Sequence, residues 1–164
     1  MRAAMPRRST APTWRALREQ DVDTVVALGV ALYAEDPGTR PIAARDVRRT
    51  LRALRAAPVR GRCVVAVVDG AIVGYALLCG FWSNELGGEV CTIDELYVAP
   101  AARSRGLGTL LLEGLAARTW PWFKRAVALE LEVTPDNHRA RRLYRRLGFR
   151  PRKNDSLRVL LPPR

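Results

Sequence analysis

Histidine and cysteine are scarce in this chain, and their scarcity limits the chemistry that it can support. The 164 residues include one histidine, His138, and three cysteines, Cys63, Cys79 and Cys91, with no C-x-x-C spacing. A structural zinc site needs a cluster of such ligands, so we expect no metal. The odd number of cysteines, each in an apolar stretch, argues against a disulfide-stabilised secreted fold and favours buried thiols.

Long apolar runs are missing as well. No stretch approaches about 18 apolar residues, so the sequence predicts no contact with a membrane through a spanning helix. The basic residues 1–11 are not followed by the apolar core of a secretory signal, and we expect them to form a flexible tail. No internal repeat or low-complexity linker interrupts residues 12–164, which we expect to form a single domain of a cytoplasmic protein.

Lysine is rare, although the chain is strongly basic. The formal net charge is +12, and Lys124 and Lys153 are the only two lysines among 28 basic residues. A large positive charge can indicate binding to nucleic acid or to a membrane surface. Here the arginines are spread along the chain without a basic, aromatic patch, which argues against nucleic acid as the main partner. An anionic cofactor would use part of the same charge.

The spacing of apolar residues predicts the order β-α-α-β-β-β-α-β-α-β-β. Helices are expected at residues 21–33, 43–57, 106–119 and 136–148. Strands are expected at residues 13–17, 63–68, 72–81, 89–98, 126–133, from 149 onward and at 156–161. Asp21 would cap the first helix, and Asp69-Gly70 would form a hairpin turn. This order favours an α/β fold with a mixed sheet and helices on both faces.

A turn with the features of an anion site follows the strand that ends at Val98. The segment Arg103-Ser104-Arg105-Gly106-Leu107-Gly108 leads directly into a predicted helix. The first N–H groups of a helix have no partner within the helix, and its dipole favours negative charge there. The segment lacks the third glycine of a dinucleotide fingerprint and the lysine of a P-loop. Taken alone, it is compatible with a phosphate site or with a plain tight loop.

Two motifs resemble those of the GCN5-related N-acetyltransferases, the GNAT superfamily. The segment that resembles the family's motif A is Leu96-Tyr97-Val98-x-Pro100-x-x-Arg103-x-x-Gly106-x-Gly108-x-x-Leu111. The segment that resembles motif B is Asn137-x-x-Ala140-x-x-Leu143-Tyr144-x-x-Leu147-Gly148-Phe149. Ser104 departs from the family, in which many members carry glycine at that place. The resemblance implies the GNAT fold: a mixed, mostly antiparallel sheet of six or seven strands, two of them central, parallel and splayed, flanked by about four helices.

The resemblance also implies a site for acetyl-coenzyme A (acetyl-CoA). The backbone of the turn would hold the pyrophosphate, and the exposed main chain at Leu96 and Val98 would pair with the pantetheine arm. Asn137 would lie near either group, and Tyr144 near the thioester sulfur. The full set implied is Leu96, Tyr97, Val98, Arg103, Ser104, Arg105, Gly106, Leu107, Gly108, Thr109, Asn137 and Tyr144.

The implied activity is transfer of the acetyl group to a primary amine by direct attack in a ternary complex. Such chemistry needs a group that takes a proton from the ammonium and a group that gives one to the leaving thiolate. Asp94 and Glu95 are the candidates for the base, because two adjacent acids in a buried strand are costly without a role. They would point to opposite faces of a regular strand, so one of them would face the reaction unless a bulge intervenes. Tyr144 is the candidate for the acid.

Few acidic residues are present, and several gather in two short regions. Glu35 and Asp36 follow the first predicted helix, and Glu85 lies near Trp82 before the central strand. This pattern suggests a cationic acceptor, such as a polyamine, an aminoglycoside, an amino acid derivative or a peptide amine, with Trp82 stacking on the cation. Two alternatives stay open: a non-catalytic acetyl-CoA-binding regulatory domain, and a nucleic-acid binder that uses the helix at 43–57. Many members of the family are dimers, so a homodimer also stays open.

Overall fold

The computed structural model describes residues 11–154, 156 and 158–160. The chain divides into two compact units, Met1–Glu132 and Val133–Arg164, which are described separately. All of the expected N-terminal tail except Ala11 lies outside the described residues. That residues 12–164 form one domain stays a prediction.

The first unit is built on a five-stranded sheet in the order β1-β2-β3-β4-β5. Its strands are β1 (Thr13–Ala16), β2 (Gly61–Val68), β3 (Ala71–Ser83), β4 (Gly88–Val98) and β5 (Ala128–Leu131). Neighbouring strands from β1 to β4 pair antiparallel, and β4 pairs with β5 in parallel. The mixed, mostly antiparallel sheet of the α/β prediction is therefore confirmed, with five strands among the described residues where six or seven were expected.

The prediction of strands after the last helix is wrong for residues 149–154, 156 and 158–160, which form no strand. Residues 157 and 161, which complete the last predicted strand, lie outside the described residues. Pro151 cannot donate a backbone hydrogen bond to a neighbouring strand, and Arg150, Arg152 and Lys153 leave this stretch with little apolar surface to bury. A short apolar pattern was not enough to define a strand here.

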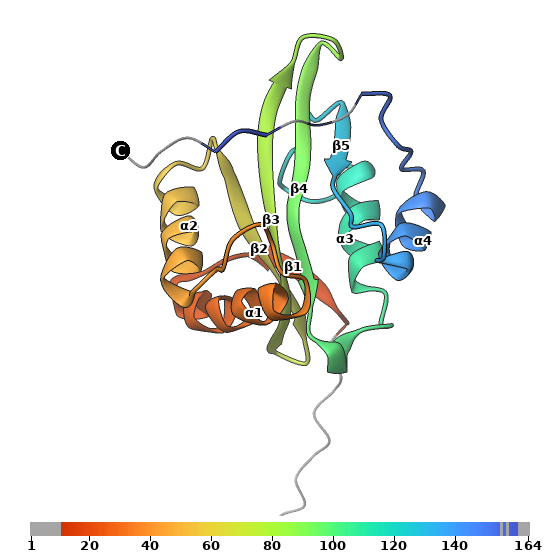
Figure 1. Cartoon of the computed structure of the whole chain (residues 1–164). Coiled ribbons are helices and arrows are strands. Elements are labelled where there is room, and N and C mark those ends of the chain that lie inside the picture. The colour runs from red at the N-terminus through yellow and green to blue at the C-terminus, as the bar shows by residue number, and fades with distance from the viewer. Residues whose placement is uncertain (1–10, 155, 157, 161–164) are drawn as a thin grey trace, which may run out of the picture. The chain divides into compact units, whose positions relative to one another are not determined.

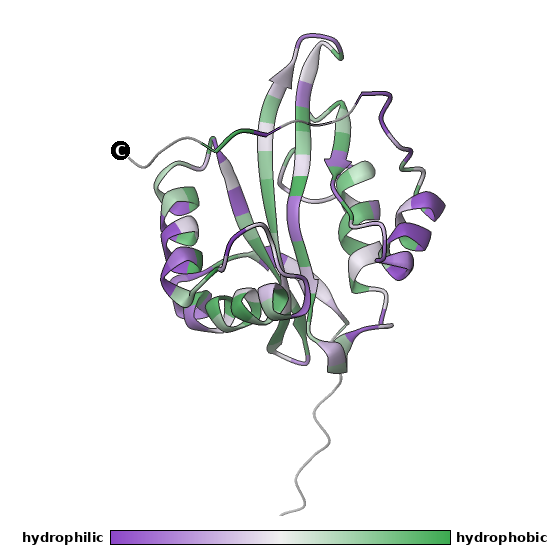
Figure 2. Cartoon of the chain, viewed as in Figure 1, coloured by the Kyte–Doolittle hydropathy of each residue, from purple (hydrophilic) through white to green (hydrophobic). Residues whose placement is uncertain are grey.

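Three helices of the first unit enclose the sheet: α1 (Val22–Glu35), α2 (Ala44–Ala56) and α3 (Leu107–Ala116). Figure 1 shows α1 and α2 on one face of the sheet and α3 on the other. Val47 and Leu51 of α2 are buried, whereas the remaining faces of that helix are polar, as the purple residues along it show (Figure 2). The buried side chains of α1, α2 and the sheet form one hydrophobic cluster around Tyr75, which is fully buried.

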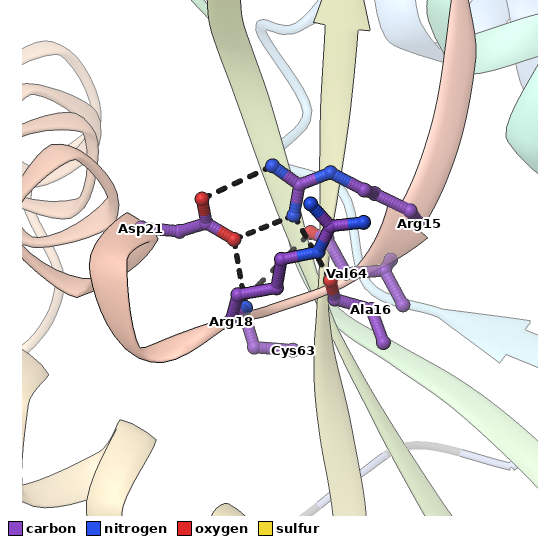
Figure 3. Close-up of polar contacts among 6 residues, drawn as sticks. All are labelled: Arg15, Ala16, Arg18, Asp21, Cys63 and Val64. Atoms are coloured by element: carbon purple, nitrogen blue, oxygen red, sulfur yellow. Dashed lines mark hydrogen bonds and ion pairs between the residues drawn. The ribbon is translucent and has the colours of Figure 1, made fainter.

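A partly buried ion pair connects the start of α1 to β1 (Figure 3). Asp21 is only 3% exposed, and its Oδ2 and Oδ1 accept hydrogen bonds from the two Nη atoms of Arg15 at 2.5 and 3.0 Å. The backbone N–H of Arg18 donates to the same carboxylate at 2.7 Å. Asp21 precedes α1 as predicted, but its side chain turns back to these donors and does not cap the helix. The Arg15 guanidinium lowers the pKa of Asp21.

The second unit contains α4 (His138–Arg146). Its start agrees with the prediction, since the Asn137 side chain accepts a hydrogen bond from the Ala140 N–H at 3.0 Å and caps the helix. Its end also agrees, since Gly148 follows in the left-handed region with φ of 91°. The ring of Tyr144 contacts that of Phe149, with 5.8 Å between centroids. The motif that suggested this helix therefore folds through ordinary capping signals.

Candidate functional site

The turn after β4 has the backbone of an anion-binding loop. Pro100–Ala102 form a short 3-10 helix, and α3 begins at Leu107. Between them Ser104 and Gly106 have positive φ values of 67° and 75°. A side chain added at Gly106 would meet no atom within 4 Å, so the space in front of the turn is open. The first N–H groups of a helix have no acceptor within the helix, so phosphate oxygens could accept hydrogen bonds at the start of α3.

The edge of β4 beside this turn is open over its last residues. Parallel pairing with β5 reaches Ile93, opposite Leu131, and among the described residues no strand pairs with β4 on this side beyond that point. The Ala99 N–H donates to Val73 of β3 at 2.8 Å. Because backbone groups alternate in direction along a strand, those of Leu96 and Val98 then face the open edge. The residues of this edge could pair with an extended ligand such as a pantetheine arm.

A bulge in β4 separates the two candidate bases. Glu95 lies opposite Leu77 of β3, whereas the next pair is Leu78 with Ile93, so that Asp94 is the extra residue. A bulge of this kind re-aims the side chains on either side of it. Asp94 is exposed and Glu95 is partly buried. The alternation expected of a regular strand therefore does not decide between them.

Two tyrosines hold the Glu95 carboxylate, and the sequence did not predict either of them as a site residue. The Tyr33 hydroxyl of α1 donates to Oε1 at 2.6 Å, and the Tyr75 hydroxyl of β3 donates to Oε2 at 2.6 Å. Burial first, and Glu95 second, raise the pKa of both phenols well above the usual value. Both therefore stay protonated at neutral pH and act as donors. Glu95 is a fixed acceptor of hydrogen bonds with one further lone pair on each oxygen.

A small pocket adjoins Glu95 on the face of the sheet that α1 and α2 cover. Its lining combines one carboxylate and two hydroxyl groups with apolar walls, and the residues are Val47, Thr50, Leu51, Tyr75, Leu77 and Glu95. An apolar pocket with a few convergent polar groups is the usual form of a small-molecule site. Thr50 and the walls from α2 were not predicted, because a helical apolar stripe looks the same whether it packs a core or lines a pocket.

Glu35 and Arg103, predicted to bind acceptor and cofactor respectively, contact each other. The Arg103 Nη2 lies 2.6 Å from Glu35 Oε2, and Glu35 Oε1 accepts from the Tyr97 hydroxyl at 2.7 Å. Arg103 also donates from Nε to the Val98 carbonyl at 2.8 Å and stacks over the Tyr97 ring, with 5.4 Å to its centroid. Arg103, with Tyr97 second, lowers the pKa of Glu35. Asp36 follows as an exposed residue just beyond α1.

The hairpin between β3 and β4 carries the other two residues predicted to bind the acceptor. Trp82, which is 72% exposed, lies opposite Glu89 on the way to the tip, and Glu85 is exposed at the tip itself. Leu77, the partner of Glu95, is five residues before Trp82 on β3, which is roughly 16 Å along a strand. The structure therefore does not bring Trp82 and Glu85 to the Glu95 pocket.

The predicted residues of the second unit lie on one helix. Burial raises the pKa of Tyr144, so its phenol is protonated at neutral pH. Asn137 uses its side-chain oxygen to cap α4, which leaves its amide N–H groups for other partners. His138 is exposed in the first turn of the same helix.

Within the described part of the chain, no group of three or more His, Cys, Asp or Glu residues could hold a metal ion. No helix in that part is long and apolar enough to cross a membrane.

Comparison with known proteins identifies similar sequences. The Acetyltransferase (GNAT) family model matches residues 27–149. A mycothiol acetyltransferase of Parafrankia sp. (strain EAN1pec) is 36% identical over 155 residues, which are 93% of this chain and 41% of that protein. An L-2,4-diaminobutyric acid acetyltransferase of Nocardia farcinica (strain IFM 10152) is 36% identical over 77 residues, which are 47% of this chain and 37% of that protein. The chain thus spans less than half the length of these relatives.

A solved structure shares the fold. The aminoglycoside N-acetyltransferase AAC(6')-Iy, in complex with CoA, matches with a TM-score of 0.69 at 19% sequence identity, over 98% of this chain and 99% of that chain. Identity at this level shows the fold alone. The mixed sheet that the sequence motifs predicted is therefore shared with a known CoA-binding structure.

Proposed function

The chain belongs to the acetyltransferase (GNAT) family, and we propose that it transfers the acetyl group of acetyl-CoA to a primary amine of a small cationic acceptor. One observation carries this proposal: within a single unit, the open edge of β4 runs from the bulged acids at Asp94 and Glu95 into the turn at the start of α3. A ligand with an anionic end and an extended arm can occupy the turn and the edge together. Its reactive end would then lie beside the acids.

The residues of the turn and of the open edge fit acetyl-CoA. Backbone N–H groups between Arg103 and Thr109 would hold the pyrophosphate, and the backbone groups of Leu96 with the Val98 N–H would pair with the pantetheine arm. When bound, the cofactor supplies an acetyl group activated as a thioester. The Val98 carbonyl already accepts a hydrogen bond from Arg103, so it contributes less to the arm than the family resemblance implied.

Glu95 is the residue that we propose binds the acceptor amine. Its two oxygens are fixed by Tyr33 and Tyr75, which leaves one lone pair on each for an ammonium group in the adjoining pocket. The amine reacts only after it loses a proton, and Glu95, directly or through a water, would accept it. Asp94, exposed at the bulge, is the alternative base.

A cationic acceptor agrees with a carboxylate in an apolar pocket, because a positive charge leaves water there only for a fixed negative partner. The diaminobutyric acid acetyltransferase that resembles this chain acts, by its name, on a small amine. Polyamines, aminoglycosides, amino acid derivatives and peptide amines all carry such a group.

Tyr144 is the group that we propose donates a proton to the leaving thiolate. Its raised pKa keeps it protonated at neutral pH, and it matches the tyrosine of motif B. Replacement by phenylalanine keeps the ring contact with Phe149 and removes only the hydroxyl. Tyr144→Phe should therefore lower kcat by about 10²-fold or more, with little change in the KM for acetyl-CoA.

A thiol-release assay with acetyl-CoA and a panel of amines tests the proposal. We expect release with at least one small cationic amine, a raised acceptor KM for Glu95→Gln, and loss of the acidic limb of the pH profile in whichever of Glu95→Gln and Asp94→Asn removes the base. Tight binding of acetyl-CoA without release for any amine would instead indicate a non-catalytic regulatory domain. Absence of acetyl-CoA binding by calorimetry would refute the proposed function itself.

A further inference from the structure

The turn that begins α3 is tied to the far end of α1 by an ion pair between residues 68 positions apart. Arg103 is the first residue of the turn, and Glu35 is the last residue of α1. Both are partly exposed, with side chains 33% and 42% accessible. Tyr97 of β4 completes a closed group, because its hydroxyl donates to Glu35 and its ring supports the Arg103 guanidinium. Three elements of the fold therefore meet at one carboxylate.

The Arg103 side chain uses two of its nitrogen atoms, Nε and Nη2, in contacts within the protein. Nε donates to the Val98 carbonyl and Nη2 to Glu35, both at distances of charge-assisted hydrogen bonds, 2.8 and 2.6 Å. Arginine presents its N–H groups in a rigid planar fork, so the two contacts fix the plane of the guanidinium. Turning Nε and Nη2 toward a phosphate group would break both of these contacts.

The turn includes residues whose backbone conformations favour glycine. Ser104 lies in the left-handed region, where a residue with a Cβ is strained, and Gly106 meets no neighbouring atom on its open side. The shape of the turn decides whether consecutive N–H groups converge on one anion. Contacts of the Arg103 side chain with β4 and α1 therefore help to fix the start of the turn.

We propose that the side chains of Glu35 and Arg103 position the turn: they hold it in the shape that binds the pyrophosphate of acetyl-CoA and do not themselves contact the pyrophosphate. The inference rests on the proposed function and assigns Glu35 to the cofactor side of the site, where the sequence had predicted an acceptor ligand. It also gives the Arg103 side chain a structural role in the turn, whereas the sequence had predicted that its positive charge attracts the phosphate groups of the cofactor. The backbone of Arg103 keeps its predicted place in the loop.

The alternative arrangement, in which Arg103 binds the pyrophosphate directly, predicts the opposite effect of Glu35→Gln on the affinity for the cofactor. If Arg103 left Glu35 and bound the pyrophosphate, Glu35 would compete with the anion for the same guanidinium. Glu35→Gln would then strengthen binding of the cofactor, because it frees the arginine and removes a negative charge from the neighbourhood. If Glu35 positions the turn, the same substitution weakens binding.

Calorimetric titration of CoA into the full chain measures this sign without the need for turnover. We expect Glu35→Gln and Arg103→Gln each to raise the Kd for CoA by roughly three- to tenfold. This is a modest effect of the size expected for residues that are coupled through one hydrogen-bond network. The double variant should bind no more weakly than the weaker single variant, since both remove the same constraint. Matched controls are Asp23→Asn and Arg48→Gln, which make the same changes of charge in an exposed pair between α1 and α2 and should leave the Kd unchanged.

Arg103→Lys distinguishes the effect of the two hydrogen bonds of Arg103 from the effect of its positive charge. Lysine keeps the positive charge but cannot reach the Val98 carbonyl and Glu35 with one rigid fork, so it should bind CoA as weakly as Arg103→Gln. A Kd like that of the unmodified chain for Arg103→Lys would overturn the proposal. An unchanged or lowered Kd for Glu35→Gln would overturn it as well. Failure of the unmodified chain to bind CoA is a separate result, which refutes the proposed function.

Discussion

Asp21→Asn should destabilise the protein far more than its surface counterpart, Asp23→Asn. The two residues are neighbours at the start of α1, and each pairs with an arginine. Asp21 is 3% exposed, whereas the Asp23 side chain is 82% exposed. The substitution keeps the size of the side chain and removes one negative charge in both cases. Burial of the carboxylate is therefore the main difference between them.

The expected loss in the free energy of unfolding depends on the groups that paired with the Asp21 carboxylate. Removing one member of a fully buried pair costs about 3–5 kcal/mol, because the other charge stays buried without compensation. The Arg15 side chain is 26% exposed and can regain part of its hydration, and asparagine can still accept one of the hydrogen bonds. We therefore expect a loss of about 2 kcal/mol for Asp21→Asn. Asp23→Asn should cost under about 0.5 kcal/mol, as for other exposed pairs.

Urea unfolding at two pH values measures both the loss and its origin. The pKa of Asp21 is lowered in the folded protein, so its ionised form contributes stability above the unfolded pKa of about 3.9. That contribution is lost as the pH falls through the lower folded value. The difference between Asp21→Asn and the unmodified chain should therefore be constant from about pH 6 to 8 and shrink below about pH 4. Equal losses for the two variants, or a difference that grows on acidification, would refute the reasoning.

Three further substitutions test other parts of the structure. Ser104→Gly should raise the free energy of unfolding by about 0.5 kcal/mol, since relief of a φ of 67° outweighs the added flexibility of glycine; a thermal melt will show it. Gly114→Ala should cost about 2 kcal/mol, because the new Cβ would lie 2.1 Å from the Trp120 indole nitrogen, and tryptophan fluorescence during unfolding will report it. Tyr33→Phe should raise the acceptor KM by about fivefold, because Glu95 loses one donor, with an unchanged KM for acetyl-CoA as the internal control.

Elements defined by local signals were predicted well. The Asp69-Gly70 turn joins β2 to β3, Asn137 and Gly148 bound α4, and the strand–turn–helix from β4 to α3 stands where the pattern placed it. In each case the signal is a turn or capping residue that determines the conformation of the backbone only a few residues away. The strands expected after α4 had only a weak apolar pattern and a proline, and no such signal.

Features that depend on register were not predictable in the same way. The bulge at Asp94 arises because β3 and β4 change their alignment between Leu77 and Leu78, and the residues of β4 alone contain no sign of that change. Tyr33 lies 62 positions before Glu95, and an amphipathic helix gives no reason to choose it over its neighbours. Sequence patterns indicated the acids of β4 as candidate site residues, but the partners of Glu95 follow from the fold.

Three carboxylates of the first unit, those of Asp21, Glu35 and Glu95, differ in what they can still bind. Asp21 accepts three hydrogen bonds from one side of the fold and is buried, so it has a structural use. Glu35 is neutralised by an arginine, and an acceptor cation would have to displace that arginine. Glu95 alone among these three accepts from neutral donors, the two phenols, so a ligand cation would not have to displace an arginine from it. A cationic acceptor is therefore expected at Glu95, whose selectivity should depend on the Tyr33 and Tyr75 hydroxyls more than on the acids at the rim.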